Sequence, residues 1–377
     1  MKTGQFPFNY SIRITPCSSP SILFMEQLRQ ITEALLRPDR SGEQDDAALK
    51  LYSLFSALSG LHDESAGSAD DLSTVLATGE AVSPRDAARC VIDSVRTSKF
   101  LRGTYAALRE VQQRFSGGPI EILYAGCGPF AALAIPLTTQ FKADQIQFTL
   151  LDMHTRSLEL ARHLVETLGL KDYVQEYVQA DAVNYVHPRT LHMVITETMQ
   201  KALSKEPQVA ITLNLAPQLC PGGIFIPERI TIDAYLCDPR KEFAPTDRDR
   251  NDSPSLTRHA GGFGAKLGKV FELTAEKACE LGTIDDKKKC DIEAYLPATA
   301  IDLPAEIAEG LTLMLATNIT VFGTITLDEY ESGLTHPFWF HDFGGTQTRD
   351  RVEIQYGFGS SPGFEWQAPR CVSYCSP

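Results

Sequence analysis

The feature that most constrains the fold is a glycine turn between two apolar segments near the middle of the chain. Residues 120–125 form a short apolar run that ends at Gly126-Cys127-Gly128, and a second apolar run, residues 146–151, ends at Asp152. The alanines and leucines of residues 131–137 lie between them and predict a helix. Strand, glycine turn, helix, strand and acid is the order of a βαβ unit that binds a nucleotide-type cofactor. Its glycines let the backbone approach the ligand, and the acid can accept hydrogen bonds from a ribose diol.

Beyond Asp152, helical and strand-like segments alternate through residue 226. Helices are predicted over residues 155–168 and 207–220, and strands over residues 173–179, 191–196 and 224–226. Gly169 is expected to close the first of these helices. The alternation predicts an α/β fold with a parallel, doubly wound (Rossmann-like) sheet.

Three acids follow successive strands of this predicted sheet. Asp152 follows the second strand, Asp181 the third and Glu197 the fourth. Ligands of open α/β sheets bind outside the carboxyl ends of the strands, where all three acids are expected to lie. Each also has a plain alternative as a solvated loop acid, and a lone GxG is often only a tight turn. Their regular placement favours a ligand site.

The segment before the α/β unit has a helical character. Residues 1–82 carry two helical patterns, at 23–36 and 47–61, separated by a polar linker over residues 40–46. A further helix is predicted from Ser83-Pro84, a favoured N-cap followed by a favoured first residue, and runs to residue 115 with a break near residues 98–103. We therefore predict a helical N-terminal extension, residues 1–82, and a cofactor-binding domain, residues 83–228.

After residue 228 the chain becomes rich in Ile, Thr, Val and Tyr. Strand-like segments are predicted over residues 230–237, 292–296, 311–327 and 351–358. These predict a β-barrel-like domain over residues 229–377. A polar insertion at about residues 239–291 interrupts it and is typical of a partner-binding arm or a lid.

Composition excludes several classes of function. The 377-residue chain has a net charge of −13, and its nine cysteines form no CxxC pair. No apolar run approaches the ~20 residues of a membrane span, and the first residues lack the apolar stretch of a signal peptide. We expect a cytoplasmic protein with no metal site, no nucleic-acid partner and no membrane association. The negative charge mildly favours a cationic substrate.

The loop after the fourth predicted strand carries the most specific motif. Glu197 and Glu206 stand nine positions apart, and Met199 follows the first glutamate by two. This spacing resembles the double-glutamate loop of the protein arginine methyltransferases, which are class I S-adenosyl-L-methionine-dependent methyltransferases. The segment from Pro221-Gly222-Gly223 to Arg229 resembles the passage of that family into its β barrel.

Two further segments extend the resemblance to about residues 85–365. Asp93-Ser94-Val95-Arg96-Thr97 resembles the D-x-V-R-T segment of the family, whose arginine holds the methionine carboxylate of the cofactor. Thr335-His336 resembles the Thr-His-Trp loop, whose histidine pairs with the aspartate of that upstream segment.

The resemblance implies S-adenosyl-L-methionine as cofactor and a homodimer formed through the arm. The implied cofactor-binding residues are Arg96, Gly126, Cys127, Gly128, Asp152, Met153, Asp181, Ala182 and Glu197. The implied catalytic residues are Glu197, Glu206, His336 and Asp93, and the implied substrate-binding residues are Glu197, Met199, Glu206 and His336. The plain alternatives are a surface helix arginine for Arg96 and a packed loop histidine for His336.

The chemistry of the glutamates agrees with a guanidino substrate. Methyl transfer from a sulfonium to a nitrogen is an in-line displacement, so the protein mainly has to position two reactants. Carboxylates bind a planar guanidinium through paired N–H···O hydrogen bonds. Glu197 and Glu206 could localise the guanidinium charge, and one of them could accept the proton that is lost on methylation.

Three departures from the family pattern bear on the substrate. Tyr124 replaces the acid of the first strand, Pro129-Phe130 replaces a Thr-Gly pair in the turn, and Pro337 replaces the tryptophan after His336. The N-terminal extension could cap the site. This cap and the altered loop after His336 favour free L-arginine or a related small metabolite, as in natural-product biosynthesis, over an arginine-containing peptide.

Four alternatives remain open from the sequence. They are a protein arginine N-methyltransferase, a small-molecule O- or N-methyltransferase without guanidine specificity, a catalytically inactive methyltransferase-like scaffold, and an NAD-binding oxidoreductase.

Overall fold

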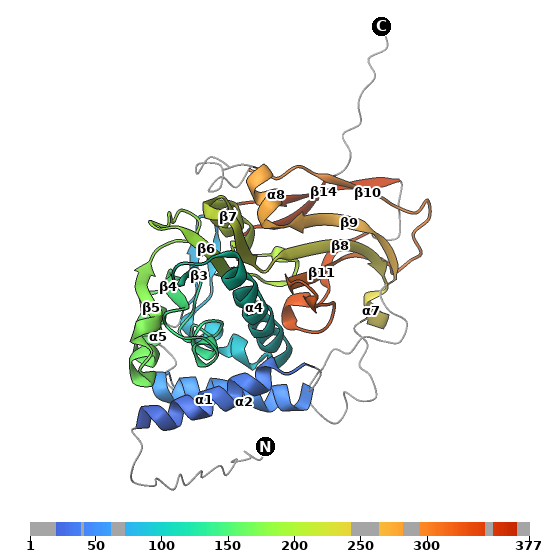
Figure 1. The fold of residues 1–377 in the computed structure, drawn as a ribbon. Helices are drawn as coiled ribbons and strands as arrows, with labels where there is room; N and C mark the ends of the chain where they lie inside the picture. Colours follow the sequence, from blue (N-terminus) through green and yellow to red (C-terminus); the bar gives the residue numbers. More distant parts are fainter. Residues whose placement is uncertain are drawn as a thin grey trace, which may run out of the picture.

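The chain is built around a parallel sheet, with two helices below it and an antiparallel β region beside it (Figure 1). The computed structural model describes residues 20–38, 41–61, 72–242, 264–281, 294–343 and 350–367. Within these ranges, helices long and apolar enough to cross a membrane are absent. The α/β architecture with a second, barrel-like β region confirms the predicted fold class.

The central sheet has five strands in the order β5-β4-β3-β6-β7, and all four pairings are parallel. Its strands are β3 (Ile120–Ala125), β4 (Ile146–Asp152), β5 (Val174–Gln179), β6 (Leu191–Thr196) and β7 (Leu219–Ile226). The chain moves outward from β3 to β5 and then returns to β6 on the other side of β3. This reversal places a topological switch point between β3 and β6, where doubly wound folds form their ligand crevice. Ala125 and Thr196, the last residues of these two strands, are register partners.

The helices predicted at residues 83–115, 155–168 and 207–220 form against this sheet, but the first breaks at a different place and the last ends at Gln218, because β7 begins at Leu219. The helices are α3 (Pro84–Arg89), η2 (Cys90–Ile92), α4 (Ser94–Arg114), α5 (Thr155–Leu168), η4 (Lys171–Tyr173), α6 (Gln208–Leu215) and η6 (Ala216–Gln218). The break expected near residues 98–103 lies instead at Asp93, which caps α4 by accepting a hydrogen bond from the Arg96 amide at 3.2 Å. Gly103 does not break the helix. A Cβ there would come within 2.3 Å of Val321 Cγ1, so the glycine allows α4 to pack closely against the β region.

The segment after the glycine turn is not the helix that its composition predicts. Residues 129–134 form turns, and only a short 3-10 helix, η3 (Ile135–Thr139), follows. Ala131 has a positive φ of 39°, and its carbonyl accepts hydrogen bonds from the Ala134 and Ile135 amides at 2.8 and 3.0 Å. Pro136 has no N–H to donate inside an α-helix, which explains the failed prediction. Phe130 anchors these turns by an edge-on ring contact with Phe55 at 5.6 Å.

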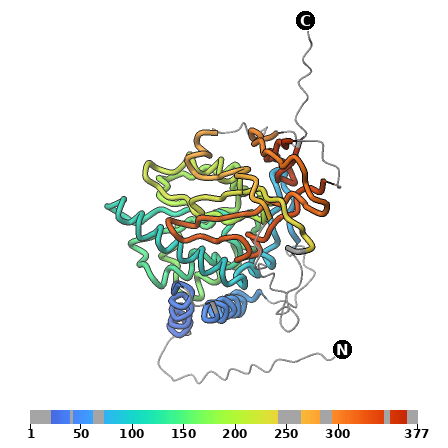
Figure 2. Tube along the Cα trace, turned by 90° about the vertical axis from the view of Figure 1, so that its right-hand side faces the viewer, coloured from blue at the N-terminus to red at the C-terminus, as the bar shows by residue number. Residues whose placement is uncertain are grey.

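In its described residues, the N-terminal extension forms two helices, α1 (Pro20–Leu36) and α2 (Ser41–Ser59), which lie side by side against the α/β unit (Figure 2). The predicted polar linker at residues 40–46 is wrong, because α2 already begins at Ser41. A polar residue of this segment satisfies a backbone group just beyond the end of α1. Gln44 Nε2 donates a hydrogen bond to the Arg37 carbonyl at 2.7 Å. A hairpin that the sequence did not reveal follows, formed by β1 (Thr74–Leu76) and β2 (Gly79–Ala81).

The β region consists of two antiparallel sheets. One has the order β12-β11-β8-β9 with β13 also on β11, and the other has the order β10-β14-β15. The strands are β8 (Arg229–Cys237), β9 (Ala265–Leu273), β10 (Thr299–Asp302), β11 (Thr312–Phe322), β12 (Ile325–Leu327), β13 (Phe338–Asp342), β14 (Arg351–Gly357) and β15 (Gly363–Gln367). Short helices accompany them: α7 (Pro239–Glu242), α8 (Ala275–Glu280), η5 (Lys201–Leu203) in the loop after β6, and η7 (Gly333–Thr335).

The predicted arm at residues 239–291 is partly wrong. Its described residues include β9, which pairs with β8 along most of its length and is an integral part of the sheet. The sequence did not predict β9 because lysines occupy exposed positions of this strand. Their charge is typical of a polar insertion and hides the strand pattern. Residues 243–263 and 282–293 lie outside the described residues.

Candidate active site

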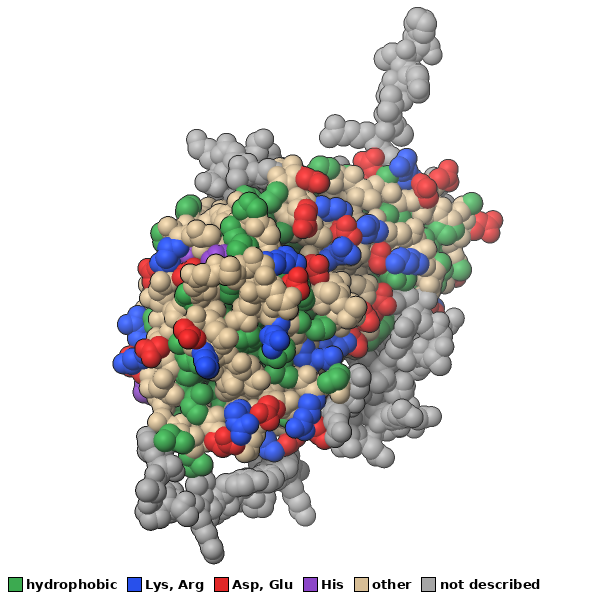
Figure 3. Space-filling view, viewed as in Figure 1, with side chains coloured by type: hydrophobic (Ala, Val, Ile, Leu, Met, Phe, Trp, Pro, Cys, Tyr) green, Lys and Arg blue, Asp and Glu red, His purple; other side chains and the backbone are tan. Residues whose placement is uncertain are grey.

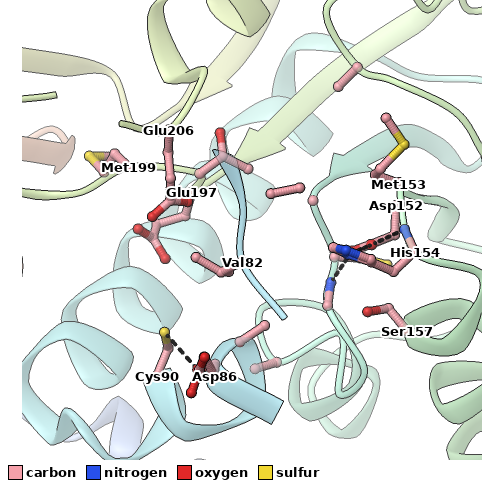
Figure 4. Close-up of a pocket in the computed structure, with 18 of the residues that line it drawn as sticks. Val82, Asp86, Cys90, Asp152, Met153, His154, Ser157, Glu197, Met199 and Glu206 are labelled. Atoms are coloured by element: carbon pink, nitrogen blue, oxygen red, sulfur yellow. Dashed lines mark hydrogen bonds and ion pairs between the residues drawn. The ribbon is translucent and has the colours of Figure 1, made fainter. Parts of the chain in front are cut away.

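A cavity of about 550 Å³ opens at the carboxyl edge of β3, β4 and β6, a size typical of small-molecule sites. Eleven of the predicted site residues line it: Arg96, Gly126, Cys127, Gly128, Asp152, Met153, Asp181, Ala182, Glu197, Met199 and Glu206. Figure 4 shows two groups, with Glu197, Glu206 and Met199 at one end, Asp152, Met153 and His154 at the other, and Val82 between them. Asp93 and His336 are not among the lining residues.

The glycine turn is shaped by backbone geometry that other residues would disturb. Gly126 and Gly128 have φ angles of +69° and +62°, in the left-handed region that favours glycine. A Cβ at Gly126 would lie 2.4 Å from Thr198 Cγ2, on the loop after β6. The Gly126 and Cys127 amides both donate to the Leu151 carbonyl, at 2.9 and 3.1 Å. The turn at Gly126 therefore lies too close to the loop after β6 to accept a side chain.

Asp152 joins this turn to the end of β4. Its Oδ2 accepts a hydrogen bond from the Gly128 amide at 2.8 Å, and its Oδ1 accepts one from the His154 amide at 2.9 Å. His154 Nε2 in turn lies 3.2 Å from Thr74 Oγ1 on β1. A carboxylate has about four lone-pair sites, so two remain on Asp152 for donors from a ligand, as a diol would supply.

Asp181 and Ala182 form the wall beyond Asp152. Asp181 Oδ1 accepts from the Val183 amide at 3.0 Å, which is the Asx-turn role that aspartate often has in loops. Asn214 Nδ2 donates to the Ala182 carbonyl at 2.9 Å and fixes the wall against α6. Both residues face the cavity, and their contact with a ligand stays a prediction.

The opposite end of the cavity holds two buried glutamates. Glu197 follows β6 directly, and its Oε2 accepts a charged hydrogen bond from Arg96 Nη2. Glu197 Oε1 is buried and has no hydrogen-bond partner among the described residues. A buried acceptor without a donor typically costs about 1–3 kcal/mol, so this oxygen is the atom that a ligand N–H would stabilise.

The charges of the two glutamates are coupled. Burial raises the pKa of Glu197, and the neighbouring Arg96 partly offsets this effect. Burial and the charge of Glu197 raise the pKa of Glu206 to about 7. Arg96 is the cation that lowers the pKa of both carboxylates, and Glu206 changes its protonation state near neutral pH. A second cation in the cavity would favour the charged form of both.

The loop that carries the glutamates is strained. Ala202, Leu203 and Lys205 have φ angles of +53°, +52° and +66°, which non-glycine residues rarely adopt. Such conformations cost of order 1 kcal/mol or more each and persist where surrounding contacts hold them.

Those contacts come from three parts of the chain. The β region holds the loop through Thr317 Oγ1, which accepts from the Ala202 amide at 2.9 Å, and Tyr356 Oη, which donates to the Leu203 carbonyl at 3.0 Å. The hairpin holds it through the Glu80 amide, which donates to the Lys205 carbonyl at 2.8 Å. The α/β unit holds its beginning through Gln208, whose Oε1 accepts from the Thr198 amide at 2.9 Å.

The predicted pairing of His336 with Asp93 is wrong. Asp93 Oδ2 accepts instead from Ser332 Oγ at 2.7 Å and from the Gly333 amide at 3.1 Å, and the described chain contains no hydrogen bond between Asp93 and His336. His336 ends η7 and lies beside the Tyr330 ring, and burial and Lys201 lower its pKa. Asp93 therefore fastens the turn before His336 to the start of α4.

Several lining residues were not predicted as site residues. Tyr124 is buried at the cavity wall, where burial raises its pKa; the sequence showed it only as a departure from a family pattern. Glu80 and Val82 belong to the hairpin and the segment after it, and strands of three residues are too short for a periodic signal. Within the described ranges, clusters of His, Cys, Asp or Glu suited to a metal ion are absent.

The fold and the cavity define a Rossmann-like α/β protein with a ligand site at its switch point, joined to an antiparallel β region. The sequence matches no protein-family model and no curated protein.

Among solved structures, the chain is similar to Trypanosoma brucei PRMT1 in an enzyme–prozyme heterotetrameric complex with AdoHcy, at 14% identity and a TM-score of 0.48 over 71% of this chain and 86% of that one. It is also similar to Arabidopsis thaliana protein arginine methyltransferase 10 in an open conformation, at 12% identity and a TM-score of 0.49 over 72% of this chain and 86% of that one.

Proposed function

We propose that this protein is an S-adenosyl-L-methionine-dependent N-methyltransferase that acts on a guanidino nitrogen. The observation that carries the proposal is the buried pair Glu197 and Glu206, with an unpartnered carboxylate oxygen, at the switch point of a Rossmann-like sheet. A guanidinium is the planar cation that two adjacent carboxylates bind best.

The Asp152 end of the cavity fits the cofactor. The turn at Gly126 and Gly128 presents backbone without side chains, and Asp152 keeps lone pairs for a ribose diol. Asp181 and Ala182 would lie beside the base. The cofactor supplies an electrophilic methyl group on a sulfonium, a cation that the acidic cavity favours.

Arg96 would connect the two ends of the cavity. Its guanidinium has five N–H donors, of which the structure gives at least one to Glu197, so others remain for the methionine carboxylate of the cofactor. The same side chain would then hold the cofactor and keep Glu197 ionised.

The glutamates would position and deprotonate the substrate. Glu197 Oε1 and Glu206 accept N–H groups of the guanidinium and orient its third nitrogen towards the methyl group. As the N–CH₃ bond forms and the S–CH₃ bond breaks, the guanidinium gains one substituent and must lose one proton. Glu206, with a pKa of about 7, is suited to accept that proton.

For the substrate we propose free L-arginine or a related small guanidino metabolite. The hairpin lines the cavity, and its Glu80 amide is hydrogen-bonded to the loop of the glutamates, so part of the N-terminal extension would lie against a bound substrate and favour a small one. The second candidate is an arginine in a protein or peptide, the substrate that the names of the two similar structures indicate for those proteins. We further propose that the protein is cytoplasmic and forms a homodimer. Light scattering would measure the mass of the particle in solution.

The test is methyl transfer followed by mass spectrometry, with free arginine and an arginine-rich peptide offered in parallel. We expect a gain of one methyl mass on a guanidine, lost in Glu197→Gln and kept in Glu280→Gln, an exposed acid on α8 that serves as the matched control. A methylated product without a guanidine would instead indicate a general small-molecule methyltransferase. A thermal shift with NAD but none with S-adenosyl-L-methionine would refute the proposal.

A further inference from the structure

Three further charged residues line the cavity: Asp86, which pairs with Arg89 at 3.7 Å, and two residues of opposite sign, Glu80 and Lys201. Glu80 lies on β2, and Lys201 begins η5 in the loop between the two glutamates. Neither residue forms an ion pair within the described ranges. Other charged side chains of the same region do: Arg96 pairs with Glu197, and Lys99 with Glu331. Glu80 and Lys201 are thus available to a ligand.

Both residues lie at the glutamate end of the cavity. The Glu80 amide is bonded to the Lys205 carbonyl, next to Glu206, and the Glu80 charge contributes to the raised pKa of Glu206. Lys201 stands between Glu197 and Glu206 in the loop. A ligand whose guanidinium meets the two glutamates would therefore have its other end near Glu80 and Lys201.

The charges that remain match one kind of ligand. A free α-amino acid with a guanidino side chain carries three charges at neutral pH: the guanidinium, an α-ammonium and an α-carboxylate. Inside a peptide the last two become neutral amides. Glu80, which is half-buried, and Lys201, which is exposed, offer a carboxylate and an ammonium that complement the two end charges of the free amino acid, and a peptide has no such charges at these positions.

We propose that Glu80 binds the α-ammonium and Lys201 the α-carboxylate of a free guanidino amino acid. This inference rests on the proposed methyl transfer to a guanidine and assigns the residues that select its substrate. Both are specificity residues, because they meet the substrate far from the reacting nitrogen.

The experiment removes each charge from the protein and from the substrate in turn. The substrates are arginine, agmatine (which lacks the carboxylate), deamino-arginine (which lacks the ammonium) and an arginine-rich peptide. The variants are Glu80→Gln and Lys201→Gln, with Glu280→Gln and Lys142→Gln as exposed controls. A thermal melt of each variant checks that it is folded.

We expect Glu80→Gln to raise KM for arginine about tenfold or more, with kcat changed little, and to leave KM for deamino-arginine within about twofold. Lys201→Gln should raise KM for arginine by a similar factor and leave KM for agmatine within about twofold. The loss that a variant shows with arginine should therefore vanish with the substrate that lacks the matching charge.

Two results would overturn the inference. Equal losses on all four substrates would make Glu80 and Lys201 structural supports of the loop. Methylation of the peptide without methylation of arginine would reject a free amino acid and leave the methyltransferase proposal standing. Failure of the proposed function looks different, since no guanidine would then be methylated by the unaltered protein.

Discussion

The two ends of the cavity are built in opposite ways. At the Asp152 end, each oxygen of the Asp152 carboxylate accepts a hydrogen bond from a nearby backbone amide, and the glycine turn and this acid belong to one βαβ unit. At the glutamate end, a carboxylate oxygen lacks a donor, Glu206 has a raised pKa, and the loop is held in strained backbone from three parts of the chain. The Asp152 end is therefore already arranged as a binding site, whereas the glutamate end would be stabilised by binding a cation. Substitutions at the two ends should therefore affect different measured quantities.

The largest effect is expected from Glu206→Gln. Loss of the proton acceptor should lower kcat about 100-fold or more, while the Kd for S-adenosyl-L-methionine changes little. Stopped assays measure kcat, and calorimetry measures the Kd for S-adenosyl-L-methionine. A comparable loss of cofactor affinity would show that the two ends do not act separately.

The same glutamate should give a pH signature. Because Glu206 has a pKa of about 7 in the folded protein, kcat/KM should rise as the pH increases from 6 to 8. Its pKa is raised on folding, so the folded state binds the proton more tightly and this carboxyl lowers stability as the pH rises from about 4.5 to 7. Glu206→Gln should consequently raise the free energy of unfolding at pH 8, by roughly 3 kcal/mol. Denaturant titration at pH 5 and pH 8 tests this, and an equal change at both values would contradict it.

Asp152→Asn should act in the opposite way. It keeps one acceptor oxygen for the glycine turn but loses the negative charge offered to a diol, so we expect about tenfold weaker binding of S-adenosyl-L-methionine. At saturating cofactor, kcat should fall less than threefold. A large fall in kcat would mean that Asp152 influences the glutamate end.

Thr317→Val tests whether the β region holds the loop. The change removes the acceptor of the Ala202 amide and leaves a buried N–H unpaired, which should cost about 1–3 kcal/mol of stability. We expect kcat to fall several-fold because Glu206 is less well positioned, with cofactor affinity unchanged. An unaltered kcat in a destabilised protein would limit Thr317 to a structural role.

Thr74→Val should have the smallest effect. It breaks the 3.2 Å contact between Thr74 and His154, which joins the exposed hairpin to the Asp152 end. We expect cofactor affinity to change about twofold at most. A larger change would show that the hairpin controls cofactor entry.

The same contrast explains what the sequence could predict. The Asp152 end depends on local features: an apolar strand, a glycine turn and an acid, all within one stretch of chain. The spacing of Glu197 and Glu206 was also visible, because both lie in one loop. The residues that hold that loop could not be predicted from the sequence. Thr317, Tyr356 and Glu80 are far from the loop in sequence, and only the tertiary structure brings them to it.

The errors in the predicted elements have local physical causes. Pro136 prevented a helix that the neighbouring alanines favour, and Asp93 capped a helix where no glycine or proline marked a break. β9 looked like a polar insertion because lysines occupy its exposed positions. Asp93 accepts a hydrogen bond from Ser332, which the resemblance did not indicate, and not from the expected partner His336.

The close packing of α4 at Gly103 has a consequence for modularity. Arg96 lies at the start of this helix, and Gly103 leaves no room for a side chain against Val321 of β11, the strand that also carries Thr317. Transplanting residues 83–228 onto a different β region would thus require a side chain that packs on Gly103, as Val321 does, and an acceptor for the Ala202 amide, as Thr317 supplies. The α/β unit and the β region should therefore be exchangeable only together, because a mismatch at Gly103 would disturb their packing and a mismatch at Thr317 would disturb the loop of the glutamates.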